Sequence, residues 1–187
     1  DEEYLYFNDD LFPVRRCEPA EFFEGGRCFL GMSHHLFAMN MFKRICRNSD
    51  RWARKALGLK PRLLFLRPQH ICTPMFRSEC EEVCDKVKEA VAKTSSSRTR
   101  TAEDLNQYLF LDYMYLKGRL KNRRLSKQHI SVGAVSVQKL RNAIVNPSKS
   151  LVCVNDVQLS EARYNELREA LLNAFEERFP YKSKYEQ

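Results

Sequence analysis

Short apolar runs that end abruptly at polar residues recur along the chain. Residues 5–10, 62–70 and 151–156 each begin with such a run and close with polar or turn-forming residues. Short continuous apolar runs with polar boundaries are typical of buried strands of the parallel type. The pattern therefore predicts a strand at the start of each segment, and the apolar residues of 130–137 indicate a further strand.

Helical periodicity fills the segments between these strands. It predicts helices over residues 33–58, 78–93, 101–118 and 160–180. The first helix is expected to form two pieces broken near Asn48, and the second to open with a capping box of Ser78 and Glu81. Gly118 and Pro180 are predicted to end the last two helices. Strands interleaved with helices predict an α/β layered domain with a mainly parallel sheet flanked by helices.

Length and composition support one packed domain over residues 1–187. The chain has 187 residues, of which 43% are hydrophobic, and this excludes collagen-like, fibrous and fully disordered proteins. No apolar run approaches the roughly 20 residues that a membrane-spanning helix needs. Because the first residue is Asp1 rather than Met, we interpret the chain as part of a larger protein.

The net charge of +8 is concentrated in two segments. Residues 43–55 carry six cations against one acid, residues 117–127 carry six cations and no acid, and the rest of the chain is slightly acidic. Such runs are usually solvated faces of a helix or loop. The alternative is an electrostatic footprint for an anionic partner: a phosphate-bearing ligand, a membrane surface or nucleic acid. We expect peripheral membrane contact through these segments, and no nucleic acid, because no nucleic-acid motif accompanies the cations.

Among the cysteines and histidines, only His70 is a candidate functional residue. Seven cysteines without a CxxC pair exclude a complete disulfide framework and zinc-finger spacing, which predicts a reducing, cytoplasmic location. Cys80 and Cys84 fall on an apolar helical stripe and are interpreted as core. His34 and His35 are adjacent, so on a helix they would not chelate one ion together. His70 differs because it follows a predicted strand directly.

Polar residues that follow the strands are the default site candidates, since open α/β sheets bind ligands at the carboxyl ends of their strands. These residues are Asn8, Asp9, Asp10, His70, Asn155 and Asp156. An acidic pair such as Asp9 and Asp10 can ligate Mg²⁺ or Mn²⁺, which prefer oxygen donors. Each residue alone is better explained as a turn former, but the combination favours a polar active centre.

Three blocks of sequence resemble the Stealth family. One block of the family is similar to Tyr4-Leu-Tyr-Phe-Asn-Asp-Asp10. The next block is similar to His70-Ile-Cys-Thr-Pro-Met-Phe-Arg77 together with residues 98–104 and the aromatic helix that ends at Gly118. The last block is similar to residues 151–156 together with residues 179–186. The blocks occur in the family's order and span almost the whole chain. A further block of the family, a strand reaching a Tyr-Thr-Trp-Val-Asp-Gly-like turn, is not found in residues 1–187, so we expect a domain that lacks its first strand block.

Stealth proteins are sugar-phosphate transferases, and the animal member is the N-acetylglucosamine-1-phosphotransferase that tags lysosomal enzymes. The resemblance implies a single catalytic-type domain of Rossmann or glycosyltransferase-A type. It also implies transfer of a sugar 1-phosphate from a UDP-sugar to a hydroxyl of a glycan acceptor. The products would be UMP and a phosphodiester-linked capsular or exopolysaccharide, made with Mg²⁺ or Mn²⁺ at the inner face of the membrane. The alternatives are a non-catalytic anion-binding module and a glycosyltransferase that moves the sugar without phosphate.

The resemblance also implies roles for individual residues. His70 is expected to act as general base or proton shuttle, Arg100 to clamp the phosphate, and Asp10 to complete the catalytic group. The expected metal ligands are Asp9 and Asp10. The expected substrate-binding residues are Asn8, Arg77, Asp104, Asn155 and Asp156. Two alternatives stay open: Arg98 competes with Arg100, and Asp104 either orients Arg100 or caps its own helix.

Overall fold

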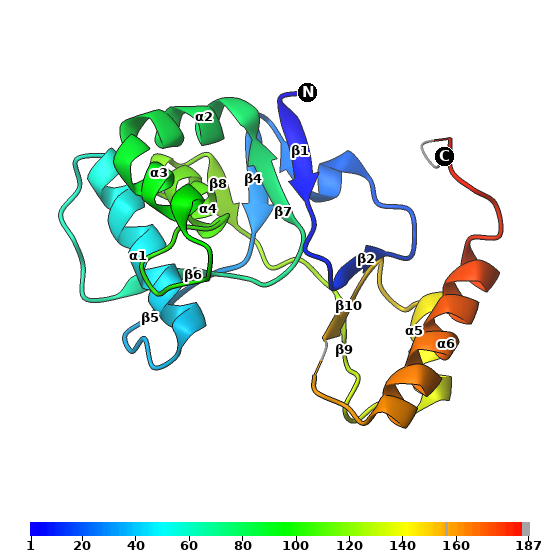
Figure 1. Ribbon diagram of the computed structural model, residues 1–187. Helices are drawn as coiled ribbons and strands as arrows, with labels where there is room; N and C mark the ends of the chain where they lie inside the picture. Colours follow the sequence, from blue (N-terminus) through cyan, green and yellow to red (C-terminus); the bar gives the residue numbers. More distant parts are fainter. Residues whose placement is uncertain (156, 185–187) are drawn as a thin grey trace. The chain divides into compact units, whose positions relative to one another are not determined.

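The computed structural model describes residues 1–155 and 157–184 (Figure 1). The contacts divide the chain into two compact units. Unit 1 comprises residues 1–6 and 18–125, and unit 2 comprises residues 7–17 and 126–187. Each unit is described by itself, and the single catalytic-type domain over residues 1–187 stays a prediction.

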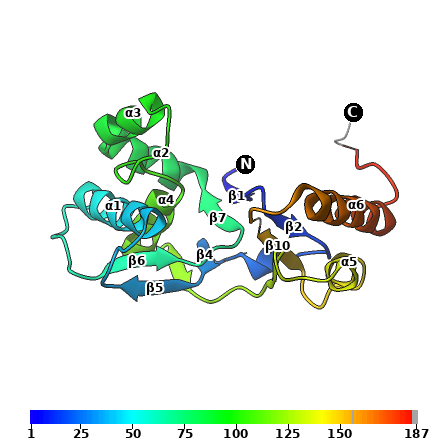
Figure 2. The same ribbon diagram turned by 60° about the horizontal axis from the view of Figure 1, so that its bottom comes forward.

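Unit 1 combines short strands with four α-helices and one 3₁₀ turn. Its strands are β1 (Glu3–Tyr6), β3 (Phe23–Glu24), β4 (Arg27–Leu30), β5 (Met32–His35), β6 (Phe65–Pro68), β7 (Thr73–Phe76) and β8 (Leu120–Asn122). Its helices are the 3₁₀ turn η1 (Pro19–Glu21) and the α-helices α1 (Met41–Ala56), α2 (Arg77–Lys86), α3 (Lys88–Ser96) and α4 (Tyr108–Lys117). β1 pairs antiparallel with β7, β5 with β6 and β3 with β4, whereas β4 and β8 are parallel. The pair β5–β6 lies beside α1 and α4 in Figure 2.

Helix α4 is the centre of unit 1. Its residues are apolar on nearly every face, as the sequence predicted, and Leu109, Leu111 and Met114 are buried. Gly118 ends the helix with φ of +79°, a left-handed conformation that glycine adopts without steric cost. The predicted C-terminus of this helix is confirmed. Its predicted start is wrong, because residues 101–107 form turns and the helix begins at Tyr108.

Helix α1 is continuous from Met41 to Ala56, so the predicted break near Asn48 is wrong. The Asn40 side chain accepts from the Lys43 amide at 2.9 Å and fixes the start of the helix. Asn48 does not compete with its own backbone, because its amide donates to the carbonyl of Glu103 at 2.5 Å. Residues 32–35, predicted as helix, form strand β5 instead, which places His34 and His35 in a strand.

The helix predicted over residues 78–93 is divided at Val87, where φ is −125° and ψ is 35°. The predicted capping box is wrong, because Phe76 is the N-cap residue of α2. The Ser78 hydroxyl instead donates to the Glu2 carboxylate, which ties α2 to the start of β1. Cys80 lies in the core as predicted, and Cys84 is half-buried; the cysteines of the described residues are all free thiols.

The described residues of unit 2 form one three-stranded sheet and two helices. The strands β2 (Leu11–Pro13), β10 (Leu151–Asn155) and β9 (Gln128–Ser131) are arranged in the order β2-β10-β9. β10 is antiparallel to β2 and parallel to β9. Helices α5 (Val137–Val145) and α6 (Glu161–Arg178) supply the apolar core together with the sheet. The strand at 151–154 and the helix starting after Ser160 are confirmed.

The α/β class is confirmed, but a mainly parallel layered sheet is not. The strands of the described residues form sheets of two or three strands, and β4–β8 and β9–β10 are parallel pairs beside four antiparallel ones. An apolar run shows that a strand is buried, and it carries no information on strand direction. None of the described helices combines the length and hydrophobicity that crossing a membrane requires.

Candidate functional site

His70 lies in the turn that follows β6, as the sequence predicted. The imidazole is half-buried, and Ile71 and Cys72 after it are fully buried and lead into β7. The chain enters this turn from one buried strand and leaves it into another. The backbone at His70 is therefore held on both sides, as a positioned general base requires.

Gln69 anchors the same turn to two other segments of unit 1. Its amide nitrogen Nε2 donates to the carbonyl of Leu125 at 2.7 Å, and Oε1 accepts from the Leu125 amide at 3.1 Å. Its backbone amide donates to the carbonyl of Gly31 at 2.7 Å. A Cβ at Gly31 would lie 2.6 Å from Oε1 of Gln69, so only glycine allows this approach. No sequence pattern predicts this anchor, because a glutamine after a strand is common.

Arg100 lies on the exposed turns that join α3 to α4. Among the described residues, its guanidinium has no hydrogen bond or ion pair. Within the described part of the chain, no hydrogen bond joins the Asp104 carboxylate to the Arg100 guanidinium: the carboxylate accepts from the Thr101 amide at 2.6 Å and from the Ser97 hydroxyl at 3.1 Å. The hydrogen bond from the Thr101 amide is the main cause that lowers the pKa of Asp104. The helix-cap interpretation of Asp104 is therefore wrong, because α4 begins at Tyr108 and Asp104 caps the turn over residues 101–104 instead. Orientation of Arg100 through this turn stays a prediction.

Arg77 is the first residue of α2. Its backbone amide donates to the Glu2 carbonyl at 2.8 Å, and its exposed guanidinium lies 3.7 Å from the Glu81 carboxylate. Exposed pairs of this kind contribute little to stability. The side chain is therefore accessible to a ligand, and substrate binding by Arg77 stays a prediction.

In unit 2, a turn over Asn8–Leu11 brings two predicted residues to the end of β10. The Leu11 amide donates to the Asn8 carbonyl at 3.1 Å, and the Val154 amide donates to the Asp10 carbonyl at 2.8 Å. Asn155 is the last residue of β10 and lies opposite Ser131, the last residue of the parallel strand β9. The structure thus brings Asn8, Asp9, Asp10 and Asn155 to the carboxyl edge of these strands. Asp156 lies outside the described residues.

The Asp10 carboxylate also accepts a hydrogen bond from the Cys153 thiol, at 3.2 Å. Burial, followed by this bond, raises the pKa of Cys153 to about 11, so the thiol is neutral at pH 7. Cys153 is therefore a donor that orients Asp10 and not a thiolate nucleophile. In the sequence, Cys153 stands out only as part of an apolar run, so this role was not predicted.

A cavity of about 280 Å³ opens at this turn in unit 2. Asp9 and Asp10 supply its acidic side, and Val154 and helix α6 supply its apolar wall. Tyr164 and Arg168, one helical turn apart on α6, also line it. Sequence reasoning counted Tyr164 as part of the apolar stripe of α6 and missed Arg168. The available signal was their spacing of four residues on a helix that follows a strand ending in Asn-Asp.

The donor set at this cavity fits a hard divalent cation. Asp9 is exposed and Asp10 is half-buried, and both offer carboxylate oxygens to the same cavity. Mg²⁺ and Mn²⁺ take oxygen ligands and keep several water molecules, so two carboxylates suffice to hold one. The unit 2 residues are therefore compatible with the predicted metal role.

The two basic segments differ in structure. In 117–127, Lys117 Nζ lies 2.6 Å from Glu79 and from Glu82, and Arg119 Nε lies 3.2 Å from Glu79. The guanidinium carbon of Arg123 lies 3.5 Å from the centroid of the Phe29 ring. Three of its six cations thus hold unit 1 together.

The segment 43–55 keeps most of its charge at the surface. Arg54 is the exception, because it is buried and its Nε donates to Asp50 at 2.8 Å. Asp50, the one acidic residue of this segment, is therefore paired with Arg54. The other five cations, which are Lys43, Arg44, Arg47, Arg51 and Lys55, remain at least partly exposed. The electrostatic footprint predicted from the sequence therefore lies on α1.

Comparison with known proteins relates the chain to one class of enzyme, the exopolysaccharide phosphotransferases. The chain is 23% identical to exopolysaccharide phosphotransferase cps2G of Lactiplantibacillus plantarum, and the match covers 100% of this chain and 64% of that protein. It is 25% and 26% identical to exopolysaccharide phosphotransferases SCO6021 and SCO6023 of Streptomyces coelicolor, again over 100% of this chain but over 36% and 33% of those proteins. The chain thus spans between one third and two thirds of the length of these curated relatives.

No protein-family profile matches the chain. The chain is nevertheless a relative of the exopolysaccharide phosphotransferases along its whole length, and the family resemblance inferred from its motifs is confirmed at that level.

Proposed function

We propose that this chain is the part of an exopolysaccharide phosphotransferase that carries its base and its phosphate-binding arginine. The reaction moves a sugar 1-phosphate from a UDP-sugar to a hydroxyl of a glycan acceptor. The acceptor oxygen forms a bond to the β-phosphorus, the bond from that phosphorus to the bridging oxygen breaks, and UMP leaves. The observation that supports this proposal is the similarity of the whole chain to three proteins named exopolysaccharide phosphotransferase.

Unit 1 would supply the proton acceptor and a cation for the phosphate. His70 is held in its turn by the anchor of Gln69, and histidine is the side chain that most often acts as a general base, so it suits removal of the acceptor proton. Arg100 would bind the non-bridging phosphate oxygens with its planar guanidinium. Because Arg100 has no partner among the described residues, no ion pair must break before it binds a phosphate. Asp104 acts through the backbone by fixing the turn on which Arg100 lies.

Unit 2 would supply the divalent cation site. Asp9 and Asp10 would hold Mg²⁺ or Mn²⁺, which neutralises charge on the diphosphate of the donor when it is bound. The Cys153 thiol orients Asp10, and Asn155 adds an amide at the same strand edge. Arg168 and Tyr164 on α6 would offer a charged and a hydroxyl group to a ligand in the cavity.

Product analysis of the full-length protein tests this function. A UDP-sugar and an oligosaccharide acceptor are incubated with the protein and Mg²⁺, and nucleotide and glycan products are separated. UMP and a phosphodiester are expected, whereas UDP and a glycosidic bond would make the protein a glycosyltransferase. No product from any donor, with strong binding to nucleic acid that weakens steeply with salt, would favour the binding-module alternative.

Two substitutions with matched controls test the residue roles. His70→Ala and Arg100→Ala are expected to lower product formation by about 10²-fold or more, since each removes a group that acts in the transition state. His129→Ala, at an exposed histidine of β9, and Arg98→Ala, in the same loop as Arg100, are expected to retain activity. Near-normal product from either His70→Ala or Arg100→Ala, or equal loss in Arg98→Ala, would contradict the assignment.

A further inference from the structure

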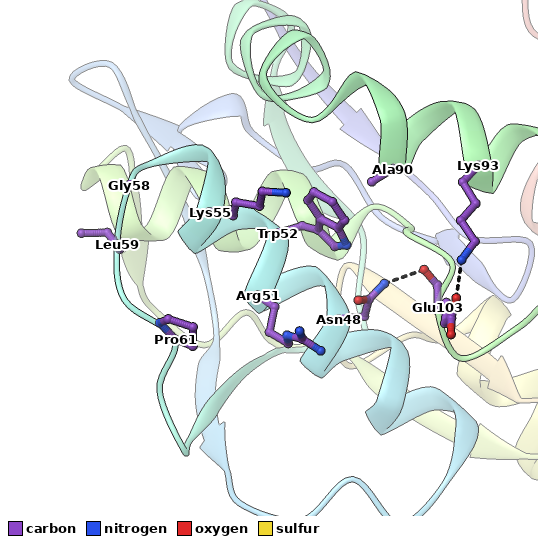
Figure 3. Close-up of a pocket in the computed structure, with 10 residues that line it drawn as sticks. All are labelled: Asn48, Arg51, Trp52, Lys55, Gly58, Leu59, Pro61, Ala90, Lys93 and Glu103. Carbon is purple, nitrogen blue, oxygen red and sulfur yellow. Dashed lines mark hydrogen bonds and ion pairs between the residues drawn. The ribbon is translucent and has the colours of Figure 1, made fainter.

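A second cavity lies in unit 1 beside helix α1, away from the turn that carries His70. It has a volume of about 550 Å³. One face of α1 forms its floor, the loop after that helix and helix α3 form its sides, and Glu103 closes one end (Figure 3). On α1, Asn48, Arg51, Trp52 and Lys55 follow one another at spacings of three, one and three residues, which places them on one helical face.

The cavity is cationic. Arg51 and Lys55 have no carboxylate partner among the described residues, whereas Lys93 forms an ion pair with Glu103. The Lys55 ammonium lies 4.3 Å from the ring centroid of Trp52, so its charge is held against the indole. Two unpaired cations thus point into one concave site, unlike Lys117 and Arg119, which are paired with glutamates.

Trp52 gives this cavity an aromatic wall. The indole is half-buried, and Figure 3 shows it between Lys55 and Asn48. The apolar C–H face of a pyranose ring packs on indole, and neighbouring ammonium and guanidinium groups bind phosphate oxygens. Sites for single-stranded nucleic acid instead need a row of aromatic rings on which successive bases stack. The single ring favours a sugar.

We propose that this cavity binds a phosphodiester-bearing segment of an anionic glycan. A sugar ring of the glycan packs on Trp52, and an adjacent phosphate contacts Arg51 and Lys55. The inference rests on the proposed function, because a glycan that grows by phosphodiester bonds carries this combination of sugar and phosphate. The cavity is then an anchoring subsite for the acceptor and separate from the groups that perform the transfer.

Glu103 connects this subsite to the loop of Arg100. It lies three residues after Arg100, its carbonyl accepts from the Asn48 amide, and its carboxylate pairs with Lys93. The next residue, Asp104, caps the turn over residues 101–104. A glycan in the cavity therefore contacts a segment that is continuous with the catalytic loop.

Intrinsic fluorescence tests the proposal directly, because Trp52 is the one tryptophan of the 187-residue chain. A phosphodiester-linked oligosaccharide is titrated into the wild-type protein without UDP-sugar or divalent cation, and the change in Trp52 emission gives Kd. The double substitution Arg51→Glu with Lys55→Glu is expected to weaken binding by about tenfold or more. The matched control is Lys121→Glu with Arg124→Glu, an equal charge change at exposed residues outside the cavity, and it is expected to bind within about twofold of wild type. Circular dichroism of each variant confirms that it is folded.

Three outcomes would overturn the proposal. Equal binding of a neutral oligosaccharide of the same sugars would remove the role of phosphate, and equal binding of an oligonucleotide with the same number of phosphates would remove the role of the sugar. Equal weakening in both charge-reversal variants would show long-range attraction rather than a site. Because the measurement needs no turnover, His70→Ala is expected to bind the oligosaccharide normally. Binding that persists in a protein without transferase activity would count against the proposed function and leave this site standing.

Discussion

The buried carboxyl group of Asp112 makes the stability of unit 1 depend on pH. Asp112 lies on α4 with 0% of its surface exposed, and neither carboxylate oxygen has a hydrogen-bond partner among the described residues. On α1, Arg54 already donates to Asp50 at 2.8 Å. Burial first, and repulsion from Asp50 second, raise the pKa of Asp112 well above its usual value, and the attraction of Arg54 opposes them.

The direction of the effect follows from proton binding. A carboxyl group whose pKa is higher in the folded state holds its proton more tightly there, so the free energy of unfolding is largest below the unfolded-state pKa of 3.8. It then falls as the pH rises toward the folded-state pKa, by about 1.4 kcal/mol per pH unit for one proton. Asp112→Asn keeps the shape of the side chain and removes the titration. The variant should therefore gain about 1.4 kcal/mol over wild type for each pH unit through which Asp112 stays protonated.

Urea unfolding between pH 4 and pH 7 measures this difference. The wild type and Asp112→Asn should agree within about 1 kcal/mol at pH 4 and diverge as the pH rises. Each kcal/mol corresponds to about 2–4 °C in Tm for a chain of this size. The control is Asp85→Asn, at an exposed residue paired with Lys88 at 3.4 Å, which should change stability little at any pH. Parallel stability curves for wild type and Asp112→Asn would refute the reasoning, because they would show that Asp112 titrates alike in the folded and unfolded states.

The remaining predictions concern other ionisable or anchored residues. The hydrogen bonds of Lys117, Lys86 and Tyr113 lower the pKa of Glu82 to about 2. The ionised carboxylate therefore contributes to the free energy of unfolding above pH 4.5, and this contribution is lost as the pH falls toward 2. Because the Glu82 side chain is 40% exposed, Glu82→Gln should lower the free energy of unfolding by about 1 kcal/mol at pH 7 and leave it unchanged at pH 2, as measured by urea unfolding. Gly31→Ala should lower product formation by about tenfold or more with less effect on Tm, because a Cβ at residue 31 displaces the Gln69 side chain beside His70. An unchanged kcat in this variant would show that the Gln69 contacts are not needed for catalysis. Asp104→Ala should lower product formation without changing glycan affinity, because it releases the turn that carries Arg100; normal activity in this variant would show that the turn does not position Arg100.

Element positions could be predicted where one local signal dominates. The end of α4 at Gly118 and the start of α6 after Ser160 follow from glycine geometry and a serine cap, and both were predicted. Strand β10 was predicted because its apolar residues 151–154 are followed directly by a polar residue, Asn155, which the structure includes as the last residue of the strand. Predictions failed where a distant partner decides the conformation. Asn48 was read as a helix breaker, yet its amide bonds to the Glu103 carbonyl, 55 residues away in sequence.

The same distinction applies to the candidate site. The sequence placed His70 after a strand and the polar residues of unit 2 at a strand edge, because those positions follow from the order of apolar and polar residues. It did not reveal the Gln69 anchor, the Cys153 bond to Asp10 or the cavity residues Tyr164 and Arg168. Each of these depends on segments that are far apart in sequence, and a local pattern carries no record of such pairings.

Charge illustrates how structure changes the meaning of a sequence pattern. The two basic segments look alike in the sequence, with six cations each. In 117–127, Lys117 and Arg119 balance Glu79, so removal of either cation would leave a buried carboxylate short of a partner. In 43–55, the buried Arg54 is balanced by Asp50, and no ion pair joins Arg51 or Lys55 to a carboxylate of the described residues. A phosphate group of a glycan can bind a cation without competition only where no carboxylate already pairs with that cation. Arg51 and Lys55 beside Trp52 meet this condition. Lys117 and Arg119 do not.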